Sequence, residues 1–257
     1  VVLGGRLEGK FLPDQVIPFS VSREDAEKGF KDYVCKKKFV PRAFYNKKQV
    51  ESITGVYFPY WHYNTRLEGK MQGEARNVRV WRTGNTEYTE TKYYQVSREG
   101  DVKLENLTEN ALGKANQELI CGVMPYDFKD VKKFQLGFLS GFLAEKRDIE
   151  KKQIEKKVQQ EARESAEKLM REQINGYSSV SVKNADFRAL KEKWSYTLLP
   201  VWTITYKAKN GKIYYFSMNG QTGKVYGELP TDYKKISLVS GIVSLVTLVI
   251  LLLGGLA

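Results

Sequence analysis

The sequence predicts an α+β fold with two antiparallel β-meanders, a long bracing helix and one C-terminal transmembrane helix. Tyrosine, threonine and valine, which favour strands, are frequent in residues 51–108 and 177–232. Charged residues surround a narrow apolar stripe in residues 143–174, which is typical of a helix. The last 22 residues, 236–257, carry no charge in a chain that is 28% charged.

These observations divide the chain into five segments. We expect an N-terminal helical segment in residues 1–50 and a first β-meander in 51–108. A helical region that contains the long charged helix follows in 109–176, and a second β-meander in 177–232. Residues 233–257 form the predicted transmembrane anchor.

The first helix is predicted in residues 22–39. Ser22 is an N-cap candidate with Asp25 three positions later, and acidic residues precede the lysines, as the helix dipole favours. Pro41 is expected to end this helix.

The two meanders are divided by short turn sequences. Gly84-Asn85 and Glu99-Gly100 predict turns in the first meander, and Asn219-Gly220 predicts a hairpin in the second. Both meanders contain an apolar-apolar-Pro-apolar-Trp step, at residues 57–61 and 198–202. The proline predicts a sheet edge or a bulge at both places, and duplication and coincidence both explain the likeness.

The long helix is predicted from about Leu143 to Ile174, about 48 Å at about 1.5 Å per residue. Asn175-Gly176 is the expected C-cap. Its apolar residues recur at helical spacing: Ile149, Ile154, Val158, Ala162, Ala166, Leu169, Met170 and Ile174.

The C-terminal anchor runs from Ile236 to Ala257 and reaches about 33 Å as a helix, enough to cross a hydrocarbon core of about 30 Å. Tyr233, Lys234 and Lys235 stand where lipid headgroups would lie. Residues 177–235 hold ten basic and four acidic side chains, a net +6, next to the span. The sequence therefore predicts a single-pass protein of the cell membrane, with the lipid bilayer as partner and most of the chain cytoplasmic.

Several kinds of chemistry find no support in the sequence. His62 is the single histidine, and it lies in an aromatic strand, where we expect a packing role; a catalytic base is the alternative. Neither GxxxxGK[ST] nor GxGxxG occurs, so no nucleotide-phosphate loop is predicted. Cys35 and Cys121 form no CxxC pair, and we expect reduced thiols in a reducing compartment. We therefore predict a non-enzymatic protein with no catalytic, metal-binding or cofactor-binding residues.

Basic clusters leave one further function open. Lys36-Lys37-Lys38, Lys47-Lys48 and Arg76-Arg79-Arg82 suit lipid headgroups or simple solvation, and they would also suit nucleic acid if they converged on one face. The alternative function is therefore a membrane-tethered nucleic-acid-associated protein. With a membrane span in the chain, we expect nucleic acid to be an unlikely partner.

Several motifs follow one another along nearly the whole chain, including LPDQVIPFSVSREDAEKGF, ITGVYFPYW, LSGFLAEKRD, LLPVW and SMNGQTGKVYGELP. In this order they resemble a bacterial family of membrane-anchored proteins with a TFIIB-type zinc ribbon, sometimes labelled primosomal or replication-restart helicases. In that family, CxxC ribbons precede the point at which this chain begins, at VVLGGRLEGK, so we expect this chain to be part of a longer protein. The resemblance implies zinc only in an upstream ribbon, and no zinc ligand falls within these residues.

The resemblance also implies a function. It points to scaffolding or recruitment at the membrane, with flotillin-like or phage-shock-type membrane proteins as partners, in homo- or hetero-oligomers. Without a nucleotide-phosphate loop, the helicase label lacks an ATP-driven engine. We expect an adaptor that assembles partner proteins at the cytoplasmic face of a bacterial membrane.

Overall fold

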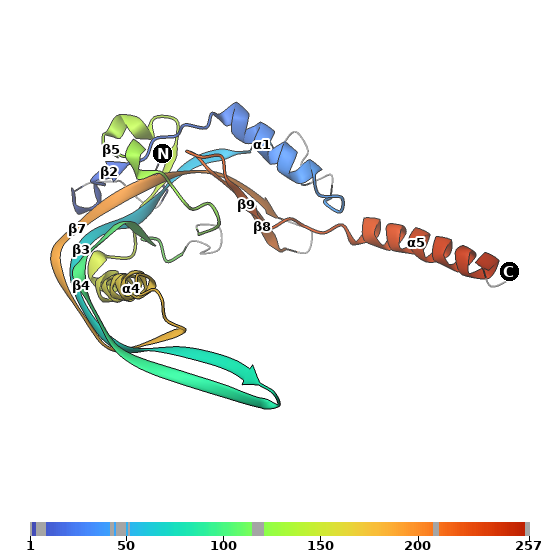
Figure 1. The fold of residues 1–257 in the computed structure, drawn as a ribbon. Helices are drawn as coiled ribbons and strands as arrows, with labels where there is room; N and C mark the ends of the chain where they lie inside the picture. The colour runs from blue at the N-terminus through green and yellow to red at the C-terminus, as the bar shows by residue number, and fades with distance from the viewer. Residues whose placement is uncertain are drawn as a thin grey trace. The chain divides into compact units, whose positions relative to one another are not determined.

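The computed structural model describes residues 2–3, 9–41, 44, 50, 52–114, 121–207 and 211–254, and it confirms the predicted α+β class (Figure 1). The α-helices whose bounds lie within the described residues are α1 (Arg23–Cys35), α4 (Lys151–Glu172) and α5 (Tyr233–Gly254). The short strands are β1 (Val2–Leu3), β2 (Gln15–Val16), β5 (Lys132–Lys133), β6 (Leu143–Glu145), β8 (Ile213–Asn219) and β9 (Val225–Gly227). Three long strands complete the described sheet: β3 (Thr54–Thr83), β4 (Thr86–Asn110) and β7 (Ser179–Lys207).

The chain forms two compact units, and each is assembled from separate stretches of sequence. Unit 1 contains residues 1–59, 114–146 and 198–257, and unit 2 contains residues 60–113 and 147–197. Strands β3 and β7 contribute residues to both units. The anchor helix α5 belongs to unit 1.

Unit 2 is built on the long β3–β4 hairpin. The two strands pair antiparallel from Tyr60↔Asn110 to Thr83↔Thr86, and Gly84 takes a positive φ of 61° in the predicted turn. The second predicted turn is wrong, because Glu99 and Gly100 lie inside β4, where they face Lys70 and Gly69 of β3. A continuous cross-strand ladder therefore outweighs the local turn preference of Glu-Gly.

Helix α4 lies against one face of this hairpin and of the neighbouring strand β7 (Figure 1). Alternate residues of β3 are buried, as expected for a strand with one covered face: Trp61, Tyr63, Thr65, Leu67, Met71 and Ala75. The buried residues of α4 follow one another at intervals of four: Ile154, Val158, Ala162, Ala166 and Met170. These five residues belong to the predicted apolar stripe, but Leu169 of that stripe is 43% exposed, and Ile149 and Ile174 lie outside α4.

The observed helix α4 is shorter than predicted at its N-terminal end. It begins at Lys151, behind a capping box formed by Glu150 and Gln153. The predicted first turns instead include strand β6, which pairs parallel with Val56 and Tyr57 of β3. The helix ends at Glu172 with Gln173 as its C-cap, and Gly176 adopts a φ of 87° in the following turn.

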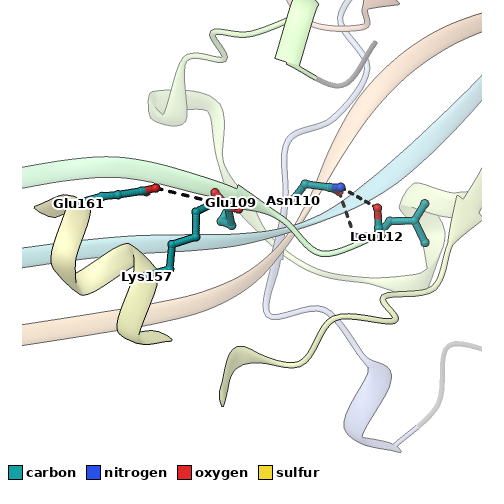
Figure 2. Close-up of polar contacts among 5 residues, drawn as sticks. All are labelled: Glu109, Asn110, Leu112, Lys157 and Glu161. Atoms are coloured by element: carbon teal, nitrogen blue, oxygen red, sulfur yellow. Dashed lines mark hydrogen bonds and ion pairs between the residues drawn. The ribbon is translucent and has the colours of Figure 1, made fainter. Parts of the chain in front are cut away.

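The C-terminal end of strand β4 makes polar contacts with α4 (Figure 2). The Lys157 ammonium of α4 lies 2.6 Å from the Glu109 carboxylate and 3.8 Å from that of Glu161. At the next residue, the Asn110 side chain donates to the Leu112 carbonyl at 2.6 Å and accepts from the Leu112 N–H at 3.0 Å. Asn110 thus satisfies the backbone groups that the sheet no longer pairs.

Unit 1 contains residues 198–207 of β7 together with β8 and β9, which form the second meander. Strand β8 pairs antiparallel with both neighbours, and the β8–β9 connection confirms the predicted hairpin at Asn219-Gly220. Helix α1 is capped by the Ser22 hydroxyl, which accepts from the Asp25 N–H at 3.1 Å. Its buried face, Ala26, Phe30 and Val34, shares one apolar core with residues of β7 and β8: Trp202, Ile204, Phe216 and Met218.

Candidate membrane-anchoring site

Helix α5 is apolar on every side. Its larger apolar side chains from Leu238 to Leu253 are 44–68% exposed, so no face of this part of the helix is covered by the rest of the described chain. Within the described residues, α5 is the one helix that is long and apolar enough to cross a membrane. A helix that packs on its own protein has a polar face toward water, whereas an all-round apolar helix is suited to lipid.

The hydroxyl of Thr247 inside α5 is satisfied within the helix. The Thr247 hydroxyl donates to the Val243 carbonyl one turn earlier, at 2.9 Å. Each backbone N–H of a membrane helix likewise needs an internal acceptor, because hydrocarbon offers none. The α-helical backbone of α5 supplies these acceptors from its own carbonyl groups.

The start of α5 is held by Asp232. Its side chain accepts from the Lys235 N–H at 3.2 Å, and its carbonyl accepts from the Ile236 N–H at 3.1 Å. The carboxylate also lies 3.9 Å from the Lys235 ammonium. A negative charge at a helix N-terminus is favourable, because the helix dipole is positive there.

The predicted anchor residues Tyr233, Lys234, Lys235 and Ile236 all lie in the first turn of α5. The helix thus begins three residues before the predicted apolar run, so the lysines are part of it. Ala257 lies outside the described residues. Tyr233 is 76% exposed, as an aromatic residue at a lipid–water interface would be.

The structure adds a segment that the sequence analysis missed. The Lys235 ammonium donates to the Val40 carbonyl at 2.7 Å, and the Asp232 N–H donates to the Phe39 carbonyl at 2.7 Å. The loop of residues 36–40, which follows α1, is therefore attached to the first turn of α5. The three consecutive lysines were the only feature of the sequence that marked this loop. Because the loop and α5 are far apart in the sequence, their contact could not be predicted.

His62 is buried in β3 and takes part in a local packing arrangement. Its Nε2 lies 3.1 Å from the side-chain oxygen of Asn106, whose own N–H donates to Asn64 at 2.7 Å. Asn106 has a φ of 62° and lies where the β3–β4 register shifts. Burial lowers the pKa of His62, against the opposing effect of the Asn106 hydrogen bond. The neutral imidazole therefore supports an irregularity of the sheet.

A second buried polar residue in unit 2 is Arg147. Its guanidinium carbon lies 4.5 Å from the ring centre of Tyr196 and 5.1 Å from that of Trp61. Burial raises the pKa of Tyr196 to about 12, against the opposing effect of the Arg147 charge. The Trp61 indole N–H donates to the Ile149 carbonyl at 2.9 Å, which holds the same segment.

The other candidate residues are dispersed. Cys35 and Cys121 are free and exposed, and the described residues contain no group of three or more His, Cys, Asp or Glu side chains suited to a metal ion. Lys36-Lys37-Lys38 belongs to unit 1 and Arg76-Arg79-Arg82 to unit 2, while Lys47-Lys48 lies outside the described residues.

The end of the β3–β4 hairpin forms an exposed aromatic surface. Strand β7 begins at Ser179, whose side chain accepts from Arg76 at 2.7 Å, so residues 79–83 and 86–90 pair only with one another in the described sheet. Trp81 and Tyr88 lie opposite in register, stacked with ring centres 5.6 Å apart, and are 42% and 46% exposed. We call residues 78–91 the hairpin tip, which extends past α4 (Figure 1).

Comparisons with known proteins show a similarity along nearly the whole chain. No family model matches the chain, and no solved structure matches it. The chain is similar to a protein of Bacillus subtilis (strain 168) designated "Uncharacterized protein YdjG", to which it is 29% identical over 259 residues. The alignment covers 99% of this chain and 76% of the relative, so the similarity extends over nearly the whole chain.

Proposed function

We propose that the protein is a non-enzymatic, membrane-anchored adaptor that assembles partner proteins at the cytoplasmic face of a bacterial membrane. The observation that carries the proposal is α5, an apolar helix that no other described part of the chain covers. Burying those side chains in lipid removes a large apolar surface from water, at about 25 cal/mol per Å².

The charge around the span supports the cytoplasmic orientation. Lys234 and Lys235 precede the apolar run directly, and cations next to a span favour the cytoplasmic side. With α5 as a single-pass anchor, residues 1–232 lie in the cytoplasm.

The hairpin tip and the free edge of β4 support the adaptor role. In the described sheet, β4 pairs with β3 alone, so its outer edge offers backbone groups along 25 residues. An unpaired edge can accept a strand from another chain, and exposed aromatic side chains are typical anchors of protein interfaces. We propose that partners bind there.

The resemblance to membrane-anchored zinc-ribbon proteins supports the same role. On this proposal, the partners are membrane-associated proteins of the flotillin-like or phage-shock type, and any zinc is held by a ribbon upstream of these residues. The chain works in homo- or hetero-oligomers and does not act on nucleic acid.

Membrane attachment is tested by fractionating cells that express the tagged full chain. We expect the chain to stay in the membrane pellet after carbonate washing and to leave it only with detergent. Protease added to intact cells should leave the N-terminal part undigested, and permeabilised cells should lose it. Recovery in the soluble fraction, or digestion from outside, would overturn the proposal.

The adaptor role is tested by affinity capture from detergent-solubilised membranes. We expect Trp81→Ser together with Tyr88→Ser to lose membrane proteins that the unchanged chain retains. Leu136→Ser is the matched control, because Leu136 is 67% exposed but lies in unit 1. Identical protein sets from all three chains would contradict partner binding at the hairpin tip.

A further inference from the structure

We propose that the hollow between the end of α1 and the start of α5 binds the phosphate headgroup of an anionic phospholipid. The inference rests on the proposed membrane attachment and adds a lipid partner to it. The hollow has a volume of about 600 Å³ and lies within unit 1. Lys36, Lys37 and Lys38 line it on the α1 side.

Hydrogen bonds between the loop of residues 36–40 and the start of α5 position the hollow next to the apolar run. The loop that carries the three lysines is bound to α5 through the Phe39 and Val40 carbonyls, which accept from Asp232 and Lys235. The lysines therefore lie next to the residue at which the apolar run begins. If α5 crosses the bilayer, these cations are at the depth of the lipid headgroups.

The charge of the hollow favours an anion. In the described part of the chain, the side chains of Lys36, Lys37 and Lys38 have no carboxylate within 4.0 Å. Two acids beside the hollow are already paired, because Asp232 lies 3.9 Å from Lys235 and Glu228 lies 3.4 Å from Lys212. An incoming phosphate would thus meet uncompensated positive charge, while Lys37 also lies 5.8 Å from the ring centre of Tyr33.

The remaining lining favours a lipid over a soluble phosphate ester. Leu229, Pro230 and Ile236 form an apolar side of the hollow, and Ile236 continues directly into the membrane helix. A phospholipid offers both parts, a phosphate for the lysines and a glycerol–acyl region for the apolar side. A free phosphate ester satisfies only the first.

The test uses the full chain reconstituted in vesicles of phosphatidylcholine with about one fifth phosphatidylglycerol, an anionic surface. Lipids that remain bound after mild detergent extraction are counted by native mass spectrometry. The test variant is Lys36→Gln, Lys37→Gln, Lys38→Gln. The control variant is Lys152→Gln, Lys156→Gln, Lys168→Gln, which removes the same three charges from exposed positions of α4.

We expect the unchanged chain and the control to retain phosphatidylglycerol in preference to phosphatidylcholine. The test variant should lose this preference by at least about tenfold, because a cation at an anionic surface is worth about a fivefold change in binding. Equal retention by both variants would overturn the site. Displacement by millimolar glycerol 3-phosphate would also overturn it, since the ligand would then be a soluble ester.

Two controls separate this inference from the proposed function. Flotation with vesicles of phosphatidylcholine alone reports on α5 and should be the same for all three chains. A chain that floats with the vesicles but shows no preference for phosphatidylglycerol contradicts only the headgroup site. A chain that fails to float with any of the vesicles contradicts the membrane attachment as well. Should the triple variant misfold, Lys37→Gln alone is expected to lower the preference by about fivefold.

Discussion

Burial governs the protonation of His62, which is only 5% exposed within β3. Because its pKa is lowered in the folded chain, the unfolded chain binds the proton more readily at mildly acidic pH. The stabilisation is fully present above the ordinary pKa of about 6.5 and is lost as the pH falls through the folded value. His62 therefore makes the chain less stable on acidification.

Replacing His62 by Gln should flatten this pH dependence. Glutamine can still donate to Asn106 but does not titrate, so unfolding free energies between about pH 7.5 and about pH 5.5 should vary less. The lost slope is at most about 1.4 kcal/mol per pH unit, the limit for one proton. Urea unfolding in detergent, followed by tryptophan fluorescence, measures it; an unchanged slope would refute the assignment.

Arg147 should contribute more to the unfolding free energy than an exposed arginine does. Its guanidinium lies against the rings of Tyr196 and Trp61, so Arg147→Leu should lower the unfolding free energy by about 2 kcal/mol. The unfolding free energy of Arg147→Lys should lie between those of the unchanged chain and Arg147→Leu, because an ammonium keeps the charge but lacks the planar stacking surface. Arg188→Gln serves as control, since Arg188 pairs with Glu68 at a side-chain exposure of 71% and should cost under about 1 kcal/mol. Equal losses at both positions would contradict this account.

At the scale of elements, the two apolar-Pro-apolar-Trp steps occupy points where strands change partners. Pro59 falls between residues of β3 paired with β6 and those paired with β4. Pro200 falls between Leu198, whose carbonyl accepts from Ile17, and Val201, which pairs with β8. A proline has no N–H to donate, so it fits an interrupted ladder. The sequence alone predicted a sheet edge or a bulge at these prolines. Only the structure shows that the strand changes its pairing partner there.

The β3–β7 contact depends on a glycine. A Cβ atom at Gly73 would lie 2.5 Å from the Ser181 carbonyl oxygen, which is backbone and cannot turn away. We expect Gly73→Ala to destabilise unit 2 by at least about 2 kcal/mol. Gly100→Ala is the matched control, because nothing lies within 4 Å of its added Cβ and β4 should tolerate or gain from it. Thermal unfolding compares them, and a tolerated Gly73→Ala would sink the close-approach argument.

The contact between α4 and β4 through Lys157 should contribute little. Lys157 is 56% exposed although it lies 2.6 Å from Glu109, and exposed ion pairs are worth about 0–1 kcal/mol. Lys157→Met should therefore change the urea midpoint only slightly, because the apolar stripe of α4 remains. A loss near that of Gly73→Ala would contradict a packing-based attachment of the helix.

At the scale of the whole molecule, α5 should be separable from the folded units. The apolar part of this helix has no buried side chains, so a chain that ends at Lys235 keeps the contact of Lys235 with Val40. We expect this shortened chain to remain in the supernatant and to unfold at the same urea concentration as the full chain in detergent. Aggregation or a lower midpoint would show that α5 contributes to the core.

The sequence by itself determined the apolar span, the lysines before it, the stripe of α4 and the second hairpin. These features depend on the spacing of neighbouring residues, and spacing decides which side of a helix or strand is apolar. Only the tertiary structure decided that Lys235 binds Val40, that Arg147 lies against the rings of Trp61 and Tyr196, and that β3 and β4 run on without a second turn. Those outcomes depend on which distant segments come into contact when the chain folds, and local sequence patterns do not specify these contacts.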